Sequence, residues 1–158
     1  ASAFSNFAKM PAQQNETLNV VEIDKLALDI FNEPYIHFMA DEQEIIAKMD
    51  RTQLIRVVTN LVKNAIQAVP EVDHPRILVS VAAEDGFVKI MVADNGIGIE
   101  ADNRDKVFEP KFTTKSSGMG LGLGMVKTIV ETYGGRIEFT SQKGKGTVFT
   151  VYLPREKA

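Results

Sequence analysis

The sequence predicts an α+β fold, a two-layer sandwich in which helices cover one face of a mixed, mostly antiparallel sheet. Three observations support this prediction. The order along the chain is helices, strands, an irregular glycine-rich region, one further helix and two final strands. The strands alternate apolar and polar residues, as half-buried strands do. A length of 158 residues accommodates one domain with a real core, and no internal repeat is visible.

The composition excludes several classes of protein. Lys plus Arg number 18 against 21 Asp plus Glu, so a net charge of −3 gives no global positive field that would draw the chain to nucleic acid or anionic lipid. The absence of cysteine rules out disulfides and Cys-based zinc sites. No apolar run reaches the roughly 18 to 20 residues of a membrane span. Because the chain begins Ala-Ser-Ala without Met, we expect a piece excised from a longer protein.

The first third of the chain contains two predicted helical segments and two short strands. ASAFSNFAKMP predicts the end of a helix near Pro11, because the residue before proline is pushed away from helical angles. We therefore expect residues 1–12 to belong to a preceding element and residues 13–158 to form the domain. After a polar loop, a helix is predicted over residues 20–31, and short strands over 35–38 and 44–48. The apolar face of that helix would carry Val20, Ile23, Leu26, Ala27 and Ile30.

The strongest helical pattern covers residues 51–69 and precedes a predicted hairpin. Its apolar stripe comprises Leu54, Val57, Val58, Leu61, Ala65 and Ala68, and its other side Arg56, Asn60, Lys63, Asn64 and Gln67. Strands over 76–83 and 87–93 are joined by Glu-Asp-Gly, which is typical of a hairpin turn. A helix over 122–133 and strands over 136–141 and 146–153 complete the prediction.

The segment Asp94-Asn95-Gly96-Ile97-Gly98-Ile99 directly follows a predicted strand. A carboxylate at a strand end accepts a hydrogen bond from an exocyclic amine, and adjacent glycines let a flat ring approach the backbone. Adenine carries such an amine, whereas a guanine carbonyl would be repelled there. The alternative is an ordinary Asp-Asn-Gly turn.

Two asparagines, Asn60 and Asn64, lie one helical turn apart and therefore side by side. Mg²⁺ prefers hard oxygen ligands and takes one or two protein groups together with substrate phosphates, so an amide oxygen facing a phosphate pocket is suitable. The alternative is a solvated polar face.

Alternating glycines in TTKSSGMGLGLG, residues 113–124, lead into the last predicted helix. Such a segment presents backbone N–H groups and a helix N-terminus, a combination that holds phosphates. Lys115 and the neighbouring hydroxyls add charge and donors. A flexible loop is the alternative. The pattern is neither a Walker A loop nor the dinucleotide fingerprint.

Taken in order, these segments resemble the ATP-binding boxes of the histidine kinase family, within the superfamily shared with gyrase, Hsp90 and MutL. TNLVKNAIQAV is similar to the N box, DNGIGIE to the first glycine box, KVFEPKFTTK to the F box and GMGLGLGMV to the second glycine box. GKGTVFTVYLP is similar to the family's closing strands. The resemblance covers roughly residues 17 to 154 and implies the family's Bergerat-type ATP-binding fold.

The resemblance also implies roles for individual residues. Asp94 would bind the adenine amine in a pocket shaped by Gly96, Gly98 and Ile99, and Asn64 would bind Mg²⁺ with Asn60 beside it. Phe108 and Phe112 would anchor a lid over 109–118, although plain core packing is the alternative for both. Lys115, with the hydroxyls of Thr113 and Thr114, would approach the phosphates, and Thr147 would close the pocket floor. The hinge and the phosphate-facing turn would be formed by Gly118, Gly120 and Gly122, and Leu121 is also expected to bind ATP.

The sequence departs from the family pattern in two respects. Gln67 and Ala68 replace a basic residue and a tyrosine after the second Asn, and NAIQA is more like the nitrogen-regulation branch of sensor kinases. His37, in a predicted strand, and His74, in a predicted loop, lie outside any helical acceptor motif. We therefore expect the phosphoacceptor histidine to lie on a separate dimerisation domain, whose last helix would end in residues 1–12.

The resemblance therefore implies the ATP-binding catalytic domain of a two-component sensor histidine kinase that uses ATP and Mg²⁺. Expected partners are its own phosphoacceptor domain and a response regulator receiver domain, without nucleic acid or direct membrane contact. The fragment would be a monomer from the cytoplasmic part of a homodimeric bacterial inner-membrane sensor. Alternatives are a gyrase-like or chaperone-like ATPase, a serine kinase acting on an anti-sigma-type partner, and a nucleotide-sensing module without phosphotransfer.

Overall fold

The structure is a computed structural model that describes residues 14–70, 72–109 and 119–156. In chain order its elements are β1 Asn15–Asn19, α2 Val20–Leu28, β2 Ile36–Ala40, β3 Ile46–Asp50, α3 Arg51–Ala68, β4 Ile77–Glu84, β5 Phe87–Asp94, the 3-10 helix η1 Ala101–Lys106, α4 Met119–Thr132, β6 Arg136–Gln142 and β7 Gly146–Pro154. The expected helical remnant over residues 1–12 lies outside the described residues.

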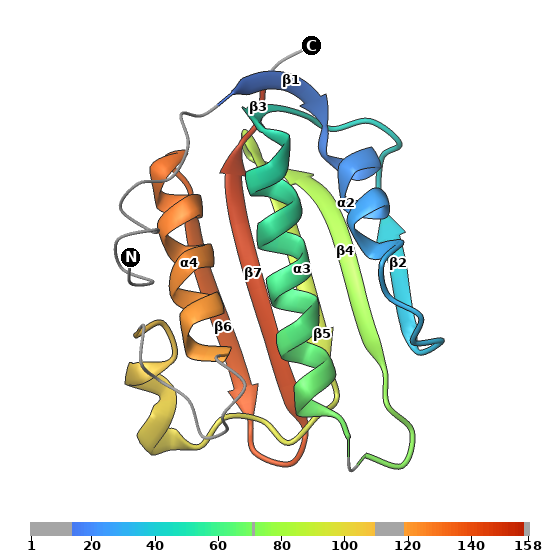
Figure 1. Cartoon of the computed structure of the whole chain (residues 1–158), viewed down its shortest axis with the longest axis vertical. Helices are drawn as coiled ribbons and strands as arrows, with labels where there is room; N and C mark the ends of the chain where they lie inside the picture. The colour runs from blue at the N-terminus through green and yellow to red at the C-terminus, as the bar shows by residue number, and fades with distance from the viewer. Residues whose placement is uncertain (1–13, 71, 110–118, 157–158) are drawn as a thin grey trace, which may run out of the picture.

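The main sheet has five strands in the order β2-β4-β5-β7-β6. Only the β2–β4 pair is parallel among these neighbours, and the other three pairs are antiparallel. Helices α2, α3 and α4 lie against one face of this sheet (Figure 1). The predicted two-layer α+β sandwich with a mixed, mostly antiparallel sheet is therefore confirmed.

The core lies between the sheet and the three helices. Alternate residues of the central strands point into it, among them Val88, Ile90 and Val92 of β5 and Phe149 and Val151 of β7. Each fully buried side chain of this kind stabilises the fold by about 1.5–3 kcal/mol relative to exposure. The core therefore holds the ends of the central strands at fixed positions beneath α3.

Two predictions for the N-terminal third were wrong. Leu26 and Ile30 were expected to be buried, but their side chains are 49% and 63% exposed. Helix α2 ends at Leu28, and its buried face includes Asp24 in place of Leu26, which an apolar pattern does not reveal. The polar loop expected before α2 contains strand β1, which pairs with β3 in a separate two-stranded sheet.

At the end of the molecule where α3 begins, the side chain of Tyr133 hydrogen-bonds to two other segments. The Tyr133 hydroxyl donates to Asn15 Oδ1 at 2.8 Å and accepts from the Asp50 backbone N–H at 3.0 Å. The Asp50 side chain in turn accepts from Thr52 and Gln53 N–H groups and caps the N-terminus of α3. These bonds fix α3 and α4 relative to the β1–β3 pair.

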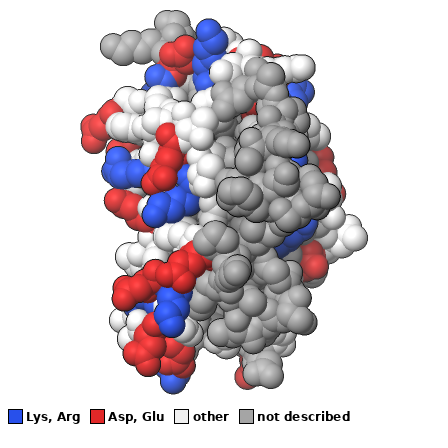
Figure 2. Space-filling view, turned by 60° about the vertical axis from the view of Figure 1, so that its left-hand side comes forward, with Lys and Arg blue, Asp and Glu red and all other residues white. Residues whose placement is uncertain are grey.

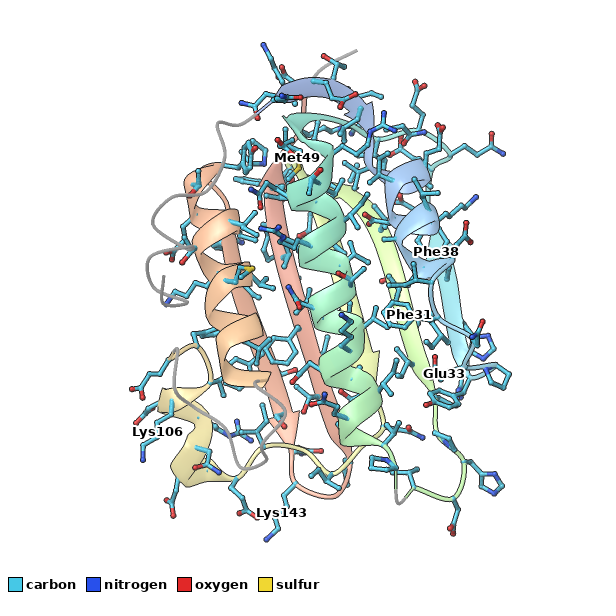
Figure 3. All side chains as sticks on the ribbon, in the orientation of Figure 1. Phe31, Glu33, Phe38, Met49, Lys106 and Lys143 are labelled. Atoms are coloured by element: carbon cyan, nitrogen blue, oxygen red, sulfur yellow. The ribbon has the colours of Figure 1, made fainter. Side chains whose placement is uncertain are left out.

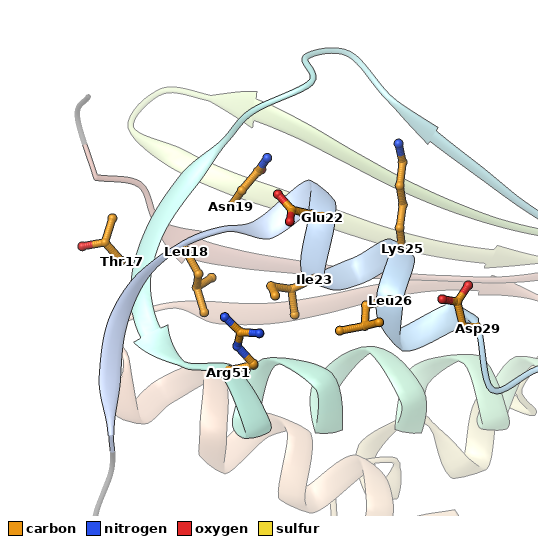
Figure 4. A pocket seen from close by; sticks show the side chains of 9 residues that line it. All are labelled: Thr17, Leu18, Asn19, Glu22, Ile23, Lys25, Leu26, Asp29 and Arg51. Atoms are coloured by element: carbon orange, nitrogen blue, oxygen red, sulfur yellow. The ribbon is translucent and has the colours of Figure 1, made fainter.

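A groove of about 440 Å³ lies near the same end, between α2 and the first turn of α3. Figure 4 shows the side chains that line it: Thr17, Leu18, Asn19, Glu22, Ile23, Lys25, Leu26, Asp29 and Arg51. None of these residues belongs to the predicted nucleotide site. At 1.5 Å per residue, α3 separates Arg51 from Ala68 by roughly 25 Å. Because Gly96 and Ile97 lie against Ala68, the groove is distant from the glycine segment that follows Asp94.

Charged side chains lie mainly on the surface. In the view of Figure 2, acidic and basic side chains are interspersed rather than gathered by sign. Exposed ion pairs include Arg136–Glu138 at 3.2 Å and Lys143–Glu100 at 2.9 Å, and pairs of this kind contribute at most about 1 kcal/mol. Within the residues that the structure describes, no helix combines the length and apolar character needed to cross a membrane.

Candidate functional site

Three polar side chains form a row across adjacent strands at one end of the core. Asp94 of β5 is the register partner of Thr147 of β7, and Thr147 is the partner of Ser141 of β6. All three lie on the helix-covered side of the sheet and are only 9%, 4% and 8% exposed. Because partners across neighbouring strands lie about 5 Å apart, their side chains share one polar patch at the edge of an apolar core.

Asp94 is a buried carboxylate held by the backbone. Its Oδ1 accepts the Gly96 N–H at 2.8 Å. Burial raises the pKa of this carboxyl above its ordinary value, and hydrogen bonds from the backbone N–H groups of Gly96 and Thr147 partly offset that rise. The Asp94 carboxylate is therefore an oriented acceptor, and a hydrogen-bond donor on a ligand would stabilise its charge.

The segment after Asp94 is clamped between α3 and the β6–β7 turn. The Ile97 N–H donates to the Ala68 carbonyl at 3.0 Å, and the Gly144 N–H donates to the Ile97 carbonyl at 2.8 Å. A Cβ on Gly96 would lie 2.2 Å from the Ala68 oxygen, so only glycine fits there. The segment is thus more than a simple turn, because backbone of α3 and of the β6–β7 turn closes around it.

Asn95 fastens the same segment on its other side. Its Oδ1 accepts the Arg76 N–H at 2.8 Å, and its Nδ2 donates to the His74 carbonyl at 2.7 Å. The Asn95 side chain therefore fixes the loop before β4, whereas the Asp94 side chain lies on the side of Thr147 and Ser141.

Gly98 adopts a φ of +77° that side chains rarely adopt, and an added Cβ would lie 2.4 Å from the Gln142 oxygen. Gly86, in the β4–β5 turn, has a similar φ of +82° but no atom within 4 Å of its Cβ position. We expect Gly98→Ala to destabilise the domain distinctly more than Gly86→Ala, because Gly86→Ala carries backbone strain alone. Chemical denaturation of both variants checks this, and equal losses would contradict the clamped geometry.

Helix α3 contacts both glycine segments, the one after Asp94 and the one at the start of α4. A Cβ on Gly122, in α4, would lie 3.4 Å from Asn60 Oδ1, which places the N-terminal half of α4 beside Asn60. Ala68 contacts the first glycine segment, as described above. On α3, Asn64 lies one helical turn from Asn60 and one from Ala68, so it lies between the two points where the glycine segments contact this helix. The predicted site residues on α3, β5 and α4 therefore come together at one end of the molecule.

Asn64 is not on a solvated face. Its side chain is buried, and its Oδ1 has no hydrogen-bond partner among the residues that the structure describes. A buried amide oxygen without a donor costs about 1–3 kcal/mol, so such an atom marks a place where a ligand is expected. The alternative of a solvated polar face is therefore wrong for Asn64, although its role as a Mg²⁺ ligand stays a prediction.

Phe108 follows η1 and packs on the sheet. Its ring makes edge contacts with Phe139 and Phe149, with centroids 5.9 Å and 6.3 Å apart, and Lys127 of α4 lies over the ring. Through these ring contacts Phe108 joins the core, and it also fixes the point from which the expected lid would start. Figure 3 shows Lys106 and Lys143 at the same end of the molecule, whereas Met49 lies at the opposite end.

Several predicted site residues lie outside the described residues: Phe112, Thr113, Thr114, Lys115 and Gly118. Gly120 and Leu121 lie in the first turn of α4, a helix that begins at Met119, three residues before the predicted start. Thr147 is the register partner of Asp94, and its place at a pocket floor stays a prediction. Ile99 donates its backbone N–H to the Ser141 hydroxyl at 2.8 Å.

Ser141 was missed by the sequence reasoning, as was Arg104, whose guanidinium donates to the Ser141 carbonyl. A signal for Ser141 was present. Positions 137 and 139 of the same strand carry apolar core-facing residues, so the alternation puts a hydroxyl at a core-facing position where the strand ends.

The chain matches the family described as histidine kinase-, DNA gyrase B- and HSP90-like ATPase over residues 49–157. It is 41% identical over 140 residues to the sensor histidine kinase ZraS of Escherichia coli strain K12, covering 89% of this chain and 29% of ZraS. It is 31% identical over 150 residues to the sensor histidine kinase WalK of Bacillus subtilis strain 168, covering 88% of this chain and 24% of WalK. The catalytic domain of histidine kinase ThkA superposes with a TM-score of 0.80 at 30% identity, covering 90% of this chain and 96% of that one.

Because the family match covers more than half of the chain, the chain belongs to the histidine kinase-, DNA gyrase B- and HSP90-like ATPase family. Within this family of ATP-binding domains, the chain is homologous to sensor histidine kinases and shares its fold with a histidine kinase catalytic domain. It spans less than a third of the length of the curated relatives named above.

Proposed function

We propose that residues 13–158 are the ATP-binding catalytic domain of a two-component sensor histidine kinase. In this proposal the domain transfers the γ-phosphate of ATP to a histidine on another domain, for relay to a response regulator. The observation that carries it is the convergence of a buried acceptor, Asp94, an unpartnered amide, Asn64, and two glycine segments at one end of the fold. The similarity to sensor histidine kinases supports the kinase over the ATPase alternatives.

Each group has a defined task in this proposal. The Asp94 carboxylate accepts the adenine amine, and the clamped Gly96–Gly98 backbone lets the ring approach. Asn60 and the glycines at the start of α4 face the phosphates, where backbone N–H groups and the helix N-terminus favour negative charge. Lys115, with Thr113 and Thr114, adds donors at the terminal phosphate. Catalysis is then mainly the positioning of the γ-phosphoryl group in line with its acceptor.

The donor set also fits a magnesium ion. Among the described residues no group of three or more His, Asp or Glu side chains could hold a metal, so protein ligation rests on an amide oxygen together with nucleotide phosphates. Asn64 Oδ1 is buried and lacks a partner, which suits a ligand of Mg²⁺. The bound ion would supply charge neutralisation at the phosphates.

The partners follow from the same proposal. His37 lies on edge strand β2 and His74 in the loop before β4, and both are exposed outside any helix. The acceptor histidine would therefore come from a phosphoacceptor domain to which residues 1–12 lead. The parent would be a homodimeric bacterial inner-membrane sensor whose cytoplasmic part includes this domain, a monomer in isolation, and it would act on a receiver domain.

Reconstitution tests the function directly. The chain is mixed with Mg-ATP and a separately produced phosphoacceptor domain from a related sensor kinase, and we expect acid-labile, base-stable phosphate on that domain. ATP hydrolysis by the chain alone at the same rate would favour the ATPase alternative. ATP binding with neither reaction, across several acceptor domains, would favour a nucleotide-sensing module.

Asn64→Ala should remove most of the Mg²⁺ dependence of ATP binding. Loss of a protein ligand is expected to lower the Mg²⁺-dependent gain in ATP affinity by about tenfold or more, whereas binding without Mg²⁺ should change little. Titration calorimetry with and without Mg²⁺ measures both quantities. Lys63→Ala, at the exposed neighbouring position, is the matched control. An unchanged Mg²⁺ effect in Asn64→Ala would remove the metal assignment.

A further inference from the structure

The Ser141 hydroxyl lies within hydrogen-bonding distance of three groups. Its Oγ accepts the Ile99 N–H at 2.8 Å, lies 2.8 Å from Thr147 Oγ1, and lies 3.3 Å from the Gly146 carbonyl oxygen. The first of these contacts ties Ser141 to the clamped segment after Asp94. The second ties it to the side chain directly opposite Asp94.

A serine hydroxyl has one proton, so these contacts can be assigned. Because Ser141 Oγ accepts from Ile99, its own proton goes either to Thr147 Oγ1 or to the Gly146 oxygen. The 2.8 Å contact between Ser141 and Thr147 allows either hydroxyl to be the donor, whereas the 3.3 Å from Ser141 Oγ to the Gly146 oxygen exceeds the usual O–H···O range. When a ligand accepts the Thr147 proton, the Ser141 proton is therefore best placed on Thr147, and the chain then runs from Ile99 N–H to Ser141 to Thr147, each bond polarising the next.

This assignment decides what Thr147 offers to a ligand. With Ser141 as donor, Thr147 Oγ1 is an acceptor within the protein, and its own proton has no acceptor among the described residues. We infer that Ser141 is a positioning residue that turns the Thr147 hydroxyl into a hydrogen-bond donor beside the Asp94 acceptor. The inference rests on the proposed function, because the paired groups are taken to face a nucleotide base.

A neighbouring acceptor and donor select one base edge over another. Adenine presents an amine donor next to a ring-nitrogen acceptor, which matches Asp94 and Thr147 in that order. Guanine presents a carbonyl acceptor next to a ring N–H donor, so both contacts are reversed. Ser141 thus contributes to the selection of adenine without touching the base.

A double-mutant cycle on ATP affinity tests this inference. Ser141→Ala and Thr147→Val are each expected to weaken ATP binding by about tenfold, and the double variant to bind no more weakly than the weaker single variant. If Ser141 only supports the fold through Ile99, the two losses multiply instead, which would overturn the inference. Circular dichroism confirms folding, and Ser141→Thr, which keeps the hydroxyl, should restore affinity if Ser141→Ala folds poorly.

The affinities for ATP analogues with altered bases give a second test, because a purely structural role of Ser141 would not change the preference among them. The parent chain should bind ATP more tightly than at least one of its 1-deaza and 7-deaza analogues. Ser141→Ala should reduce that preference. The variant should still bind a purine triphosphate that lacks the amine more weakly than ATP. Ser80→Ala and Thr150→Val, on the open face of the sheet, are matched controls. A parent that fails to bind ATP refutes the proposed function, whereas a parent that binds ATP with an unchanged analogue preference in Ser141→Ala refutes only this inference.

Discussion

Asp94→Asn is expected to lower the affinity for ATP by at least about 100-fold. The carboxylate accepts two backbone N–H groups, from Gly96 and Thr147, and still has lone pairs for a ligand amine. Asparagine has one acceptor oxygen and an NH₂ group that opposes any donor it meets. It therefore cannot satisfy both backbone donors and the adenine amine at once.

Calorimetry with ATP and GTP measures this prediction. Asp41→Asn, at an exposed bend after β2, removes the same charge far from the glycine segments and should bind ATP like the parent. The parent should strongly prefer ATP over GTP, and Asp94→Asn should lose most of that preference. Equal affinities of the parent for the two nucleotides would remove Asp94 from base recognition.

The same substitution has a pH-dependent effect on the nucleotide-free domain. Because burial raises the pKa of Asp94 in the folded state, the stability that this group contributes is present below the ordinary carboxyl pKa of about 3.9 and is lost as pH rises through the folded pKa. Asp94→Asn cannot ionise, so its stability relative to the parent should increase from pH 4 to pH 7. In the proposed function, this buried carboxylate serves ligand binding at the expense of stability.

Much of the fold could be predicted because strong periodicity and local turn chemistry determine it. The pattern over residues 51–69 gave α3, and Glu-Asp-Gly marked the β4–β5 hairpin. Strand β1 could not be predicted in this way, because it is short and polar. It is stabilised by pairing with β3 and by the Tyr133 hydroxyl, which are distant in sequence.

The candidate site divides in the same manner. Asp94, Gly96 and Gly98 stand together in one hexapeptide, so their chemistry was visible from sequence. Ser141 belongs to the site only because β6 pairs with β7 in a register that sets it opposite Thr147. The inward position of Asn64 also depends on tertiary packing, which decides how wide the buried face of α3 is.

Asp24→Asn is expected to stabilise the domain at pH 7 by at least about 1 kcal/mol. Asp24 of α2 is 0% exposed, and neither carboxylate oxygen has a hydrogen-bond partner among the described residues. Burial raises its pKa well above the ordinary value, since a low-polarity environment disfavours the charged form. Asparagine has nearly the same shape and carries no charge, so it removes the ionisation cost without opening a cavity.

The pH dependence distinguishes this explanation from a general effect on α2. The stability that protonated Asp24 contributes is fully present below the unfolded pKa of about 3.9 and is lost as pH rises through the raised folded pKa. Urea unfolding of parent and Asp24→Asn should therefore nearly coincide below pH 4 and separate progressively toward neutral pH. Glu22→Gln, on the exposed side of α2, should give a small loss instead, because it removes an acidic side chain from the first helical turn. If the difference between parent and Asp24→Asn is constant with pH, the carboxylate is compensated by partners outside the described residues, and the burial argument for Asp24 is wrong.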